Sequence, residues 1–287
     1  MWVILAFASA VFAALTTILA KCGIRRTDST VATAIRTGVV ALFAWMMVFL
    51  VGSAETIHEV SVKSWIFLIL SGMATGASWL CYFKALQLGA VNKVVAVDKS
   101  SIVFTLLLAF VLLGEPFSLI KGAALILITA GTYLMVDWKE KGEAAVHNGK
   151  WLVYALGSAV FAALTSILAK IGIENVESNL GTAIRTLVVL VMSWVMVIVT
   201  KKTKEVPLTA KKELGFIVLS GFATGGSWLC YFKALQDGLA SVVVPIDKMS
   251  ILFVVIASAL IFREKISRKA AAGLFCIVAG TLLMLFK

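Results

Sequence analysis

Two pairs of opposite charges interrupt long apolar runs of this sequence. Asp98 and Lys99 lie within VVAVDKSSIV, residues 94–103, and Asp247 and Lys248 lie within an equally apolar run near the end of the chain. At bilayer depth a charged side chain costs about 2.5–3.5 kcal/mol on insertion scales, so it normally faces a partner or a water-filled cavity. A carboxylate in such a place can take up and release a proton, and a cation can hold an anion.

The members of each pair do not face each other. Side chains that are adjacent in sequence point about 100° apart around a helix, so Asp98 and Lys99 are expected to contact other helices. Asp98 shares a helix face with Ser101, which would place a small hydroxyl beside the carboxylate. The candidate basic partners on other apolar runs are Arg36, Lys84, Arg185 and Lys233.

Two interpretations of these charges stay open. In the structural one, each aspartate forms a buried salt bridge that locks helices or repeats together. In the functional one, the charges line a pathway for substrate or protons: Asp98, Asp247, Lys99, Lys248, Arg36 and Arg185. Pro245, which replaces Ala96 of the earlier run, frees a backbone carbonyl and predicts a kink just before Asp247. An interrupted helix beside a charge favours the functional interpretation.

Aromatic residues also gather near the ends of two apolar runs, and these are Trp79, Tyr82, Trp228 and Tyr231. Trp and Tyr are common at the membrane–water interface, so one interpretation is an interfacial belt. The other is that these rings line the pathway and stack on a substrate or gate its passage.

The composition is typical of an integral membrane protein. Of 287 residues, 61% are hydrophobic and 14% are charged, against roughly half and about a quarter in soluble domains. The net charge is +11, but Lys and Arg lie in short loops, where they set membrane orientation and form no continuous face for nucleic acid. The cysteines form no close pair and both histidines lie in loops, so we expect no metal, no cofactor and no enzymatic activity.

The chain contains the same sequence pattern twice. SAVFAALT begins at Ser9 and again at Ser158, and SWLCYFKALQ begins at Ser78 and again at Ser227. These copies and the two Asp-Lys pairs are all separated by 149 residues, so no gap is needed between the halves. We therefore divide the chain into a first repeat at 1–137, a polar linker at 138–150 and a second repeat at 151–287.

Each repeat holds five apolar runs of about the 20 residues that a spanning helix needs. In the first repeat they are 2–21, 32–52, 64–85, 91–113 and 118–137, and in the second they lie 149 residues later. The sequence thus predicts an all-α integral membrane protein with ten transmembrane helices. Because five is odd, the second repeat must be inverted relative to the first if every run spans.

The loop charges agree with two inverted five-helix repeats. Equivalent loops of the two repeats carry opposite charge bias. When successive loops are assigned to alternating sides of the membrane, 17 Lys and Arg lie on one side and five lie on the other. Positive loops stay in the cytoplasm, so both termini are expected outside it. Inverted repeats are typical of secondary transporters, whose sites lie near the membrane midplane between the repeats.

Three stretches carry a family pattern: TAIRTGVVALF, LLLAFVLLGEPFSLIKGAALILITAG and IFREKISRKAAAGLFCIVAG. With their repeat equivalents they cover nearly the whole chain, which resembles the EamA-domain branch of the drug/metabolite transporter superfamily. Each repeat is similar to the half-length, five-helix bacterial and archaeal members. The resemblance implies a ten-helix transporter of small metabolites in a bacterial or archaeal plasma membrane, commonly an exporter. Ten-helix members usually have cytoplasmic termini, which the loop charges here contradict.

These observations predict a secondary transporter that works by alternating access on a small anionic or zwitterionic metabolite, such as an amino acid or organic acid. The charged residues expected near the membrane midplane include four cations and only two carboxylates, which favours a substrate with an anionic group. Without a nucleotide-binding motif the energy must come from a gradient, with the two aspartates as proton carriers. The alternative is a non-transporting scaffold or assembly subunit in which the charges are locks. The expected partners are the bilayer and a small molecule, with no nucleic acid, for a monomer or homodimer.

Overall fold

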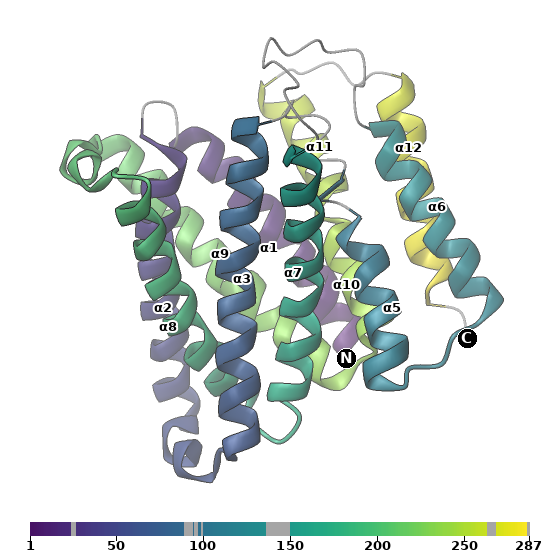
Figure 1. Ribbon diagram of the computed structural model, residues 1–287, viewed down its shortest axis with the longest axis horizontal. Helices are drawn as coiled ribbons and strands as arrows, with labels where there is room; N and C mark the ends of the chain where they lie inside the picture. Colours follow the sequence, from purple (N-terminus) through teal and green to yellow (C-terminus); the bar gives the residue numbers. More distant parts are fainter. Residues whose placement is uncertain are drawn as a thin grey trace. The chain divides into compact units, whose positions relative to one another are not determined.

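The computed structural model describes residues 1–23, 27–88, 94, 97–98, 100–135, 150–262 and 268–285, and every regular element in these ranges is a helix (Figure 1). The all-α prediction is therefore confirmed. The first half contains α1 (Trp2–Gly23), α2 (Ser29–Val51), η1 (Ser53–Glu59), α3 (Val62–Leu88), α5 (Ser101–Leu113) and α6 (Leu119–Met135). The second half contains α7 (Lys150–Gly172), α8 (Ser178–Val199), η2 (Thr203–Leu208), α9 (Lys211–Asp237), α10 (Ala240–Lys248), α11 (Ser250–Phe262) and α12 (Arg268–Leu283).

Seven segments of the described ranges are long and apolar enough to cross a membrane. They are Trp2–Ala20, Ser29–Val51, Val62–Tyr82, Lys150–Gly172, Ser178–Val199, Lys211–Asp237 and Ala240–Ala257. The helices in the remaining predicted runs are shorter but apolar, at Ser101–Leu113, Leu119–Leu134 and Ala271–Leu283. The protein thus has the helices of a multi-pass membrane protein, while the count of ten spans stays a prediction.

The helices form two compact units that do not follow the sequence halves. Unit 1 comprises Met1–Gly76 and Leu168–Gly238, and unit 2 comprises Ala77–Ile167 and Leu239–Lys287. Each unit therefore takes segments from both repeats, and α3 and α7 contribute to both units.

Unit 1 packs helices of opposite repeats against each other, with α1 against α9 and α2 against both α8 and α9. A Cβ added to Gly72 of α3 would lie 2.6 Å from the Val188 Cβ of α8, and one added to Gly221 of α9 would lie 2.7 Å from the Val39 Cβ of α2. The two contacts are related by the 149-residue offset, so the repeats make the same contact reciprocally. Only glycine lets the helices approach this closely.

Two ion pairs at helix ends define the direction of α2 relative to α8. Lys202, just after α8, pairs with Asp28, which caps the start of α2 by accepting hydrogen bonds from backbone N–H groups of its first turn. At the opposite ends, Lys63 Nζ lies 3.9 Å from a carboxylate oxygen of Glu174, between α7 and α8. The end of α8 therefore lies beside the start of α2, and the two helices run in opposite directions.

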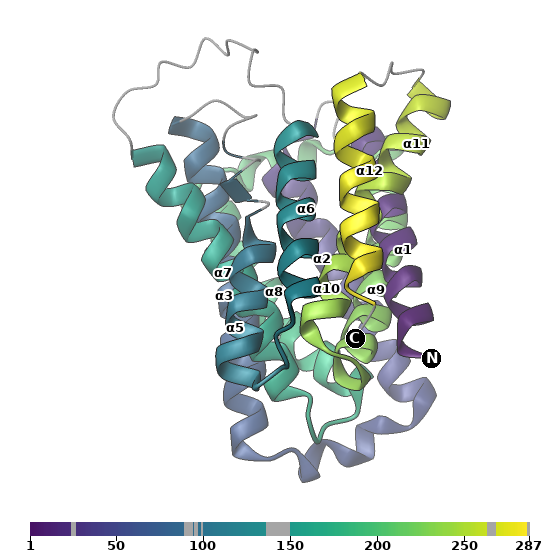
Figure 2. The ribbon, with the colours of Figure 1, turned by 90° about the vertical axis from the view of Figure 1, so that its right-hand side faces the viewer.

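Unit 2 repeats this reciprocal packing between α6 and α12, which lie side by side in Figure 2. A Cβ added to Gly131 would lie 2.5 Å from the Gly273 carbonyl oxygen, and one added to Gly280 would lie 2.8 Å from the Ala124 carbonyl oxygen. These contacts are again 149 residues apart. Reciprocal contacts at the 149-residue offset are therefore present inside each unit.

The apolar run 240–262 is not one continuous helix, because it is interrupted between α10 and α11. The Met249 N–H bonds to the Ile246 carbonyl at 3.0 Å, three residues back, which is a tighter turn than the α-helix makes. In the first repeat the Ser100 N–H bonds to the Val97 carbonyl, also at 3.0 Å. The backbone angles agree as well, with φ −62° and ψ −8° at Ser100 and φ −63° and ψ −10° at Met249.

The Asp-Lys sequence directly precedes this interruption in both repeats. The sequence predicted a kink at Pro245, just before Asp247, but the break follows Lys248. The first repeat has Ala96 at the equivalent position and makes the same turn at Ser100. The proline is therefore not the cause of the interruption, which is a property of the repeat.

Candidate functional site

The clearest buried cation in unit 1 is Arg185 of α8, which is 1% exposed. Its Nη2 donates to Thr75 Oγ1 at 2.8 Å and its Nε donates to Ser71 Oγ at 3.3 Å, both on α3. Its Cζ lies 4.4 Å from the ring centre of Phe232 and 5.2 Å from that of Trp228, both on α9. Neutral hydroxyls and aromatic faces therefore surround the guanidinium.

No carboxylate compensates this charge within the described ranges. The ion pairs found there are Lys63–Glu174, Lys202–Asp28 and Lys233–Asp237. Neither Arg185 nor its repeat equivalent Arg36 takes part in any of them. Both arginines lie seven residues into their helices, roughly 10 Å along the axis, so unit 1 carries uncompensated positive charge inside two apolar helices.

Arg36 of α2 occupies the same backbone position in its own repeat. A Cβ added to Gly221 would lie 3.2 Å from the Arg36 carbonyl oxygen, and one added to Gly72 would lie 3.0 Å from the Arg185 carbonyl oxygen. The helix contact beneath the two arginines is therefore the same.

The side chain of Arg36 nevertheless has different surroundings. The hydroxyls equivalent to those that hold Arg185 belong to Ser220 and Thr224, and no hydrogen bond joins Arg36 to either of these two described residues. Ser220 donates to the Ile217 carbonyl at 2.7 Å, and Thr224 donates to the Ser220 carbonyl at 2.7 Å. Arg36 is partly exposed, whereas Arg185 is buried.

A second polar cluster surrounds Asp98 in unit 2. The Ser158 hydroxyl of α7 donates to Asp98 Oδ1 at 2.7 Å. The Ser78 hydroxyl of α3 donates to the Ser158 carbonyl at 3.0 Å, and the two hydroxyl oxygens are 3.3 Å apart. The hydroxyl that bonds Asp98 is thus that of Ser158 on α7, while the expected neighbour Ser101 begins α5 after the turn at Ser100.

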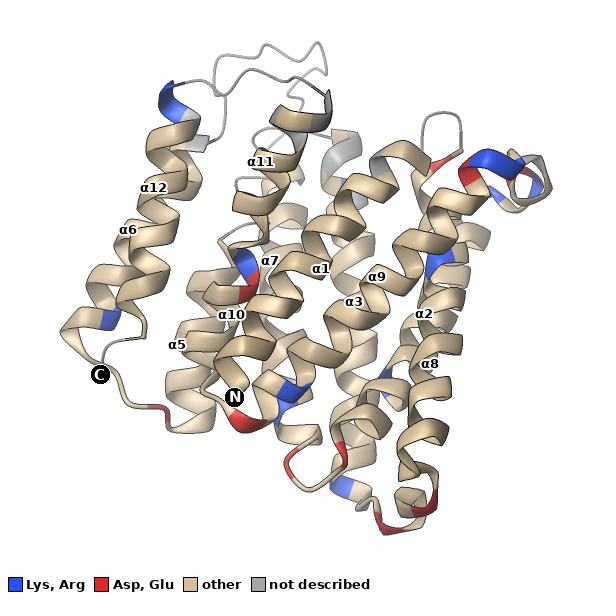
Figure 3. Ribbon diagram, turned by 180° about the vertical axis from the view of Figure 1, so that it is seen from behind, with Lys and Arg blue, Asp and Glu red and all other residues tan. Residues whose placement is uncertain are grey.

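The remaining predicted residues are distributed between the two units. Asp247 and Lys248 end α10 and are partly buried, and Lys99 lies outside the described residues. Lys233 pairs with Asp237 on the surface of α9 at 2.9 Å, so this predicted partner of Asp98 is engaged in a local ion pair. Figure 3 shows that long stretches of the helices carry no charge and that most charged residues lie near helix ends.

The aromatic candidates also differ in their surroundings. In unit 1, Trp228 contacts the Arg185 guanidinium, and Tyr231 packs edge-on against Phe232 with ring centres 5.0 Å apart. In unit 2, Tyr82 packs beside the buried cluster of Ala85, Val94 and Ala155, and Trp79 is partly buried. Trp228 therefore packs against a buried cation, a contact that residues of an interfacial belt do not need to make.

The sequence interpretation missed the small hydroxyl residues that solvate these charges. Ser71 and Thr75 hold Arg185, and Ser158 holds Asp98. A signal for them was available, since each recurs 149 residues away inside another apolar helix, as Ser220, Thr224 and Ser9. Ser9 and Ser227 also reproduce the hydroxyl contact of Ser158 and Ser78, with their oxygens 3.1 Å apart.

Glu115, which follows the end of α5, caps the start of another helix. Its carboxylate is 6% exposed and accepts hydrogen bonds from the backbone N–H of Ala240 at 2.6 Å and of Ser241 at 2.9 Å. These are donors of the first turn of α10, where a negative charge is favourable. Gly114, with φ 63°, ends α5 and makes the turn that points Glu115 away from it. Glu115 therefore positions the short helix that ends in Asp247 and Lys248.

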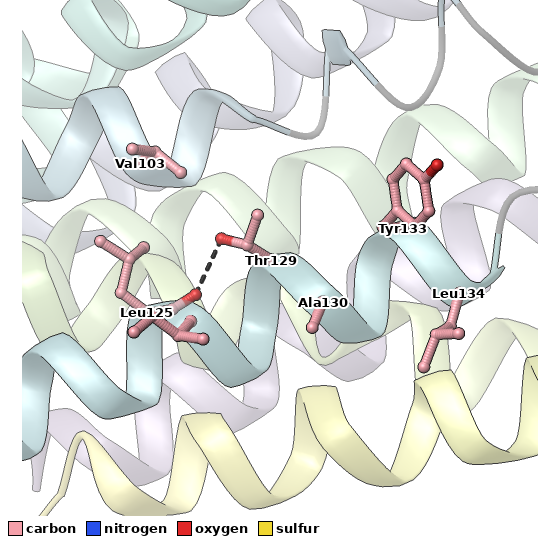
Figure 4. Close-up of a pocket in the computed structure, with 7 residues that line it drawn as sticks. Val103, Leu125, Thr129, Ala130, Tyr133 and Leu134 are labelled. Atoms are coloured by element: carbon pink, nitrogen blue, oxygen red, sulfur yellow. Dashed lines mark hydrogen bonds between the residues drawn. The ribbon is translucent and has the colours of Figure 1, made fainter.

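An open groove of about 670 Å³ lies on α6 and the facing side of α5 (Figure 4). Its walls are aliphatic apart from Thr129 and Tyr133, and the Thr129 hydroxyl donates to the Leu125 carbonyl at 2.8 Å. None of the described residues that line it is charged. An apolar groove of this kind suits lipid chains.

An all-helical chain with apolar spans and ionisable groups within them belongs to the class of multi-pass membrane proteins. The family model for the EamA-like transporter family matches residues 1–137 and again residues 149–286. The chain is therefore a member of the EamA-like transporter family, and each repeat is matched separately.

Relatives support this assignment. A Sinorhizobium protein named "Uncharacterized transporter in cobO 3'region" is 42% identical over 137 residues, which are 47% of this chain and 95% of that protein. An "Uncharacterized transporter" of Archaeoglobus fulgidus is 27% identical over 206 residues, 72% of this chain and 70% of the relative. Human solute carrier family 35 member G1 is 28% identical over 224 residues, 75% of this chain and 60% of the relative. The Sinorhizobium protein matches about one repeat, as expected for a half-length relative.

A solved crystal structure has the same fold. It superposes with a TM-score of 0.83 over 99% of this chain and 97% of its own, at 15% sequence identity. The Sinorhizobium and Archaeoglobus relatives are named as transporters, which points to a function other than catalysis.

Proposed function

We propose that this protein is a secondary transporter that moves a small anionic or zwitterionic metabolite by alternating access between two inverted five-helix repeats. The observation that carries the substrate class is the pair of arginines in α2 and α8, which have no carboxylate partner in the described ranges. A positive charge inside a spanning helix is costly, and an anionic solute that binds nearby offsets part of this cost. An amino acid or organic acid meets this requirement, and an organic cation does not.

Reciprocal packing supports the alternating-access part of the proposal. Both units contain contacts that recur at the 149-residue offset, and α2 runs opposite to α8. Inverted repeats related in this way can exchange their conformations, which opens the site to one side and then to the other. In this arrangement the loops rich in Lys and Arg lie in the cytoplasm and both termini lie outside it, in the plasma membrane of a bacterium or archaeon.

Protons are the coupling ion in this proposal. Asp98 and Asp247 each directly precede a helix interruption, and interrupted helices near the midplane are where transporters place their coupling ions. Asp98 is held by a neutral hydroxyl that can stay bonded to either protonation state. The carboxylate can release its proton when a cation approaches and take one up when the cation moves away.

The test is transport by purified protein in proteoliposomes. A panel of radiolabelled amino acids and carboxylic acids is offered with and without an imposed pH gradient, and hydrophobic cations are offered as competitors. We expect exchange of at least one acid and accumulation driven by the gradient. Inhibition by hydrophobic cations, with none by amino or organic acids, would contradict the proposed substrate class.

The scaffold alternative makes a different prediction for the same experiment. If the charges are only structural locks, no solute of the panel crosses the membrane and the arginine variants lose stability alone. Metabolite profiling of cells with and without the gene adds an independent measurement, since a scaffold leaves the export of small acids unchanged.

A further inference from the structure

The difference between Arg36 and Arg185 assigns them different tasks. Resting on the proposed transport of an anionic solute, we infer that Arg36 is the residue that contacts the substrate's anionic group in the observed conformation. Arg185 is bonded within the protein in this conformation and does not contact the substrate. The ligand class for Arg36 is a carboxylate or a similar small oxyanion.

Arg185 is already engaged by contacts within the protein. Its Nη2 and Nε donate to Thr75 and Ser71, and Phe232 and Trp228 lie against the guanidinium. At 1% exposure the side chain leaves no surface for a solute to approach. A substrate would have to displace both hydroxyls and a ring to reach this cation.

Arg36, by contrast, is not held by hydroxyls, although the surrounding protein removes much of its water. It is partly exposed and is joined to neither Ser220 nor Thr224, although these residues occupy the positions of Ser71 and Thr75. No ion pair in the described ranges includes it. A guanidinium has five N–H donors arranged for two parallel bonds to a carboxylate, so an Arg36 without these partners can bind this group with good geometry.

The two arginines are related by the symmetry of the repeats. The helix backbones that carry them pack alike, because Gly221 lies against the Arg36 carbonyl and Gly72 lies against the Arg185 carbonyl in the same way. Each arginine thus has an equivalent pair of hydroxyls on a neighbouring helix, and only Arg185 is hydrogen-bonded to its pair. Exchange of the repeats' conformations would free Arg185 and place Arg36 on Ser220 and Thr224. The cation that meets the anion would then alternate with the state of the transporter.

Phenylglyoxal, which modifies accessible arginines, tests this assignment without a known substrate. Labelling of the full-length protein in proteoliposomes is followed by mass spectrometry of the peptides that carry each arginine. We expect Arg36 to be modified at least about tenfold faster than Arg185, since exposure and hydrogen bonding control access. Equal rates, or faster modification of Arg185, would overturn the inference.

Paired hydroxyl variants sharpen the same experiment. The double variant Ser71→Ala with Thr75→Val removes the bonds that hold Arg185, so its modification should accelerate towards the rate of Arg36. The matched variant Ser220→Ala with Thr224→Val removes hydroxyls that do not bond Arg36 in the observed conformation, so it should change the rate of Arg36 much less than the first variant changes the rate of Arg185. If the two double variants change the rates alike, the asymmetry has no basis in these hydroxyls and the inference fails.

Transport separates this inference from the proposed function. For the acid of the panel that the wild type exchanges fastest, Arg36→Lys should raise KM about tenfold or more, because the two-bond geometry is lost. The same acid should protect Arg36 from phenylglyoxal. If acids are exchanged but KM rises only in Arg185→Lys, the inference is wrong and the transport function stands. If no acid is exchanged by the wild type and none slows the labelling of Arg36, both are wrong.

Discussion

The two repeats place equivalent arginines in different surroundings, although the helices around them pack in the same way. Arg185 is buried against hydroxyls and aromatic rings, and Arg36 is partly exposed and makes neither of the equivalent bonds. The glycine contacts beneath them differ by only a few tenths of an ångström. A duplicated scaffold can therefore keep its backbone symmetry while its charged side chains depart from it. In the proposed transport cycle, this departure distinguishes one end of the cycle from the other.

The aspartates provide the largest expected difference between the repeats. We predict that Asp247→Asn abolishes pH-driven accumulation in proteoliposomes and that Asp98→Asn reduces it less. Both precede a helix interruption, but only α10 contains Pro245, whose missing N–H leaves its backbone easier to rearrange. Solute exchange without a gradient should partly survive in both variants. A double variant with the pH dependence of the wild type would show that the aspartates are structural locks.

Stability should separate the two arginines next. Arg185→Gln removes two charge-assisted hydrogen bonds and the contacts with two rings, so we expect a loss of about 3 kcal/mol. Arg36→Gln removes neither kind of contact and should cost less than about 1 kcal/mol. Thermal unfolding of the purified proteins in detergent measures both. Equal losses would mean that Arg36 has structural bonds equivalent to those of Arg185.

The glycine contacts should behave alike in the two repeats. Gly72→Ala and Gly221→Ala each insert a methyl group where a Cβ lies under 3 Å from the facing valine, so each should cost about 1–3 kcal/mol. Thermal unfolding again provides the measurement, with Gly215→Ala as the control because a Cβ added there would have no atom within 4 Å. A large difference between the two contact variants would show that the backbone symmetry is itself broken.

The smallest effect concerns the helix starts. Burial acts to raise the pKa of Asp28, but the hydrogen bond from Lys202 and those from backbone N–H groups outweigh it, so the pKa lies below the ordinary 3.8. The ionised carboxylate therefore stabilises the fold above that ordinary value, and the contribution is lost as the pH falls through the lowered pKa. Asp28→Asn keeps the cap and should cost up to about 1 kcal/mol at neutral pH.

The equivalent cap of α8 is the control for this prediction. Glu177 accepts a hydrogen bond from the Leu180 N–H at 2.9 Å and has no lysine partner among the ion pairs of the described ranges. Glu177→Gln should therefore change stability less than Asp28→Asn does. Unfolding at neutral and strongly acidic pH measures both, and the deficit of Asp28→Asn should disappear in acid. A deficit that persists there would assign it to the cap and not to the ion pair.

Much of this protein could be predicted from the sequence because bilayer helices leave strong local signals. Apolar runs of about 20 residues and an exact 149-residue offset determined the all-helical fold, the duplication and the family resemblance. The same signals pointed to the intramembrane charges, since Asp and Arg are conspicuous where almost everything else is apolar. Local composition is sufficient for these conclusions, because a spanning helix needs a continuous apolar run whatever its neighbours are.

Only the tertiary structure decided what each charge contacts. Ser158 beside Asp98, Thr75 beside Arg185 and Glu115 on the first turn of α10 are contacts between helices far apart in the chain. The interruption after Lys248 could not be distinguished from a continuous apolar helix by hydropathy. Arg36 and Arg185 occupy the same position in their repeats, so no local pattern separates them. Their difference arises from side-chain packing and hydrogen bonding across helices, which depend on three-dimensional neighbours and not on the residues next to them in sequence.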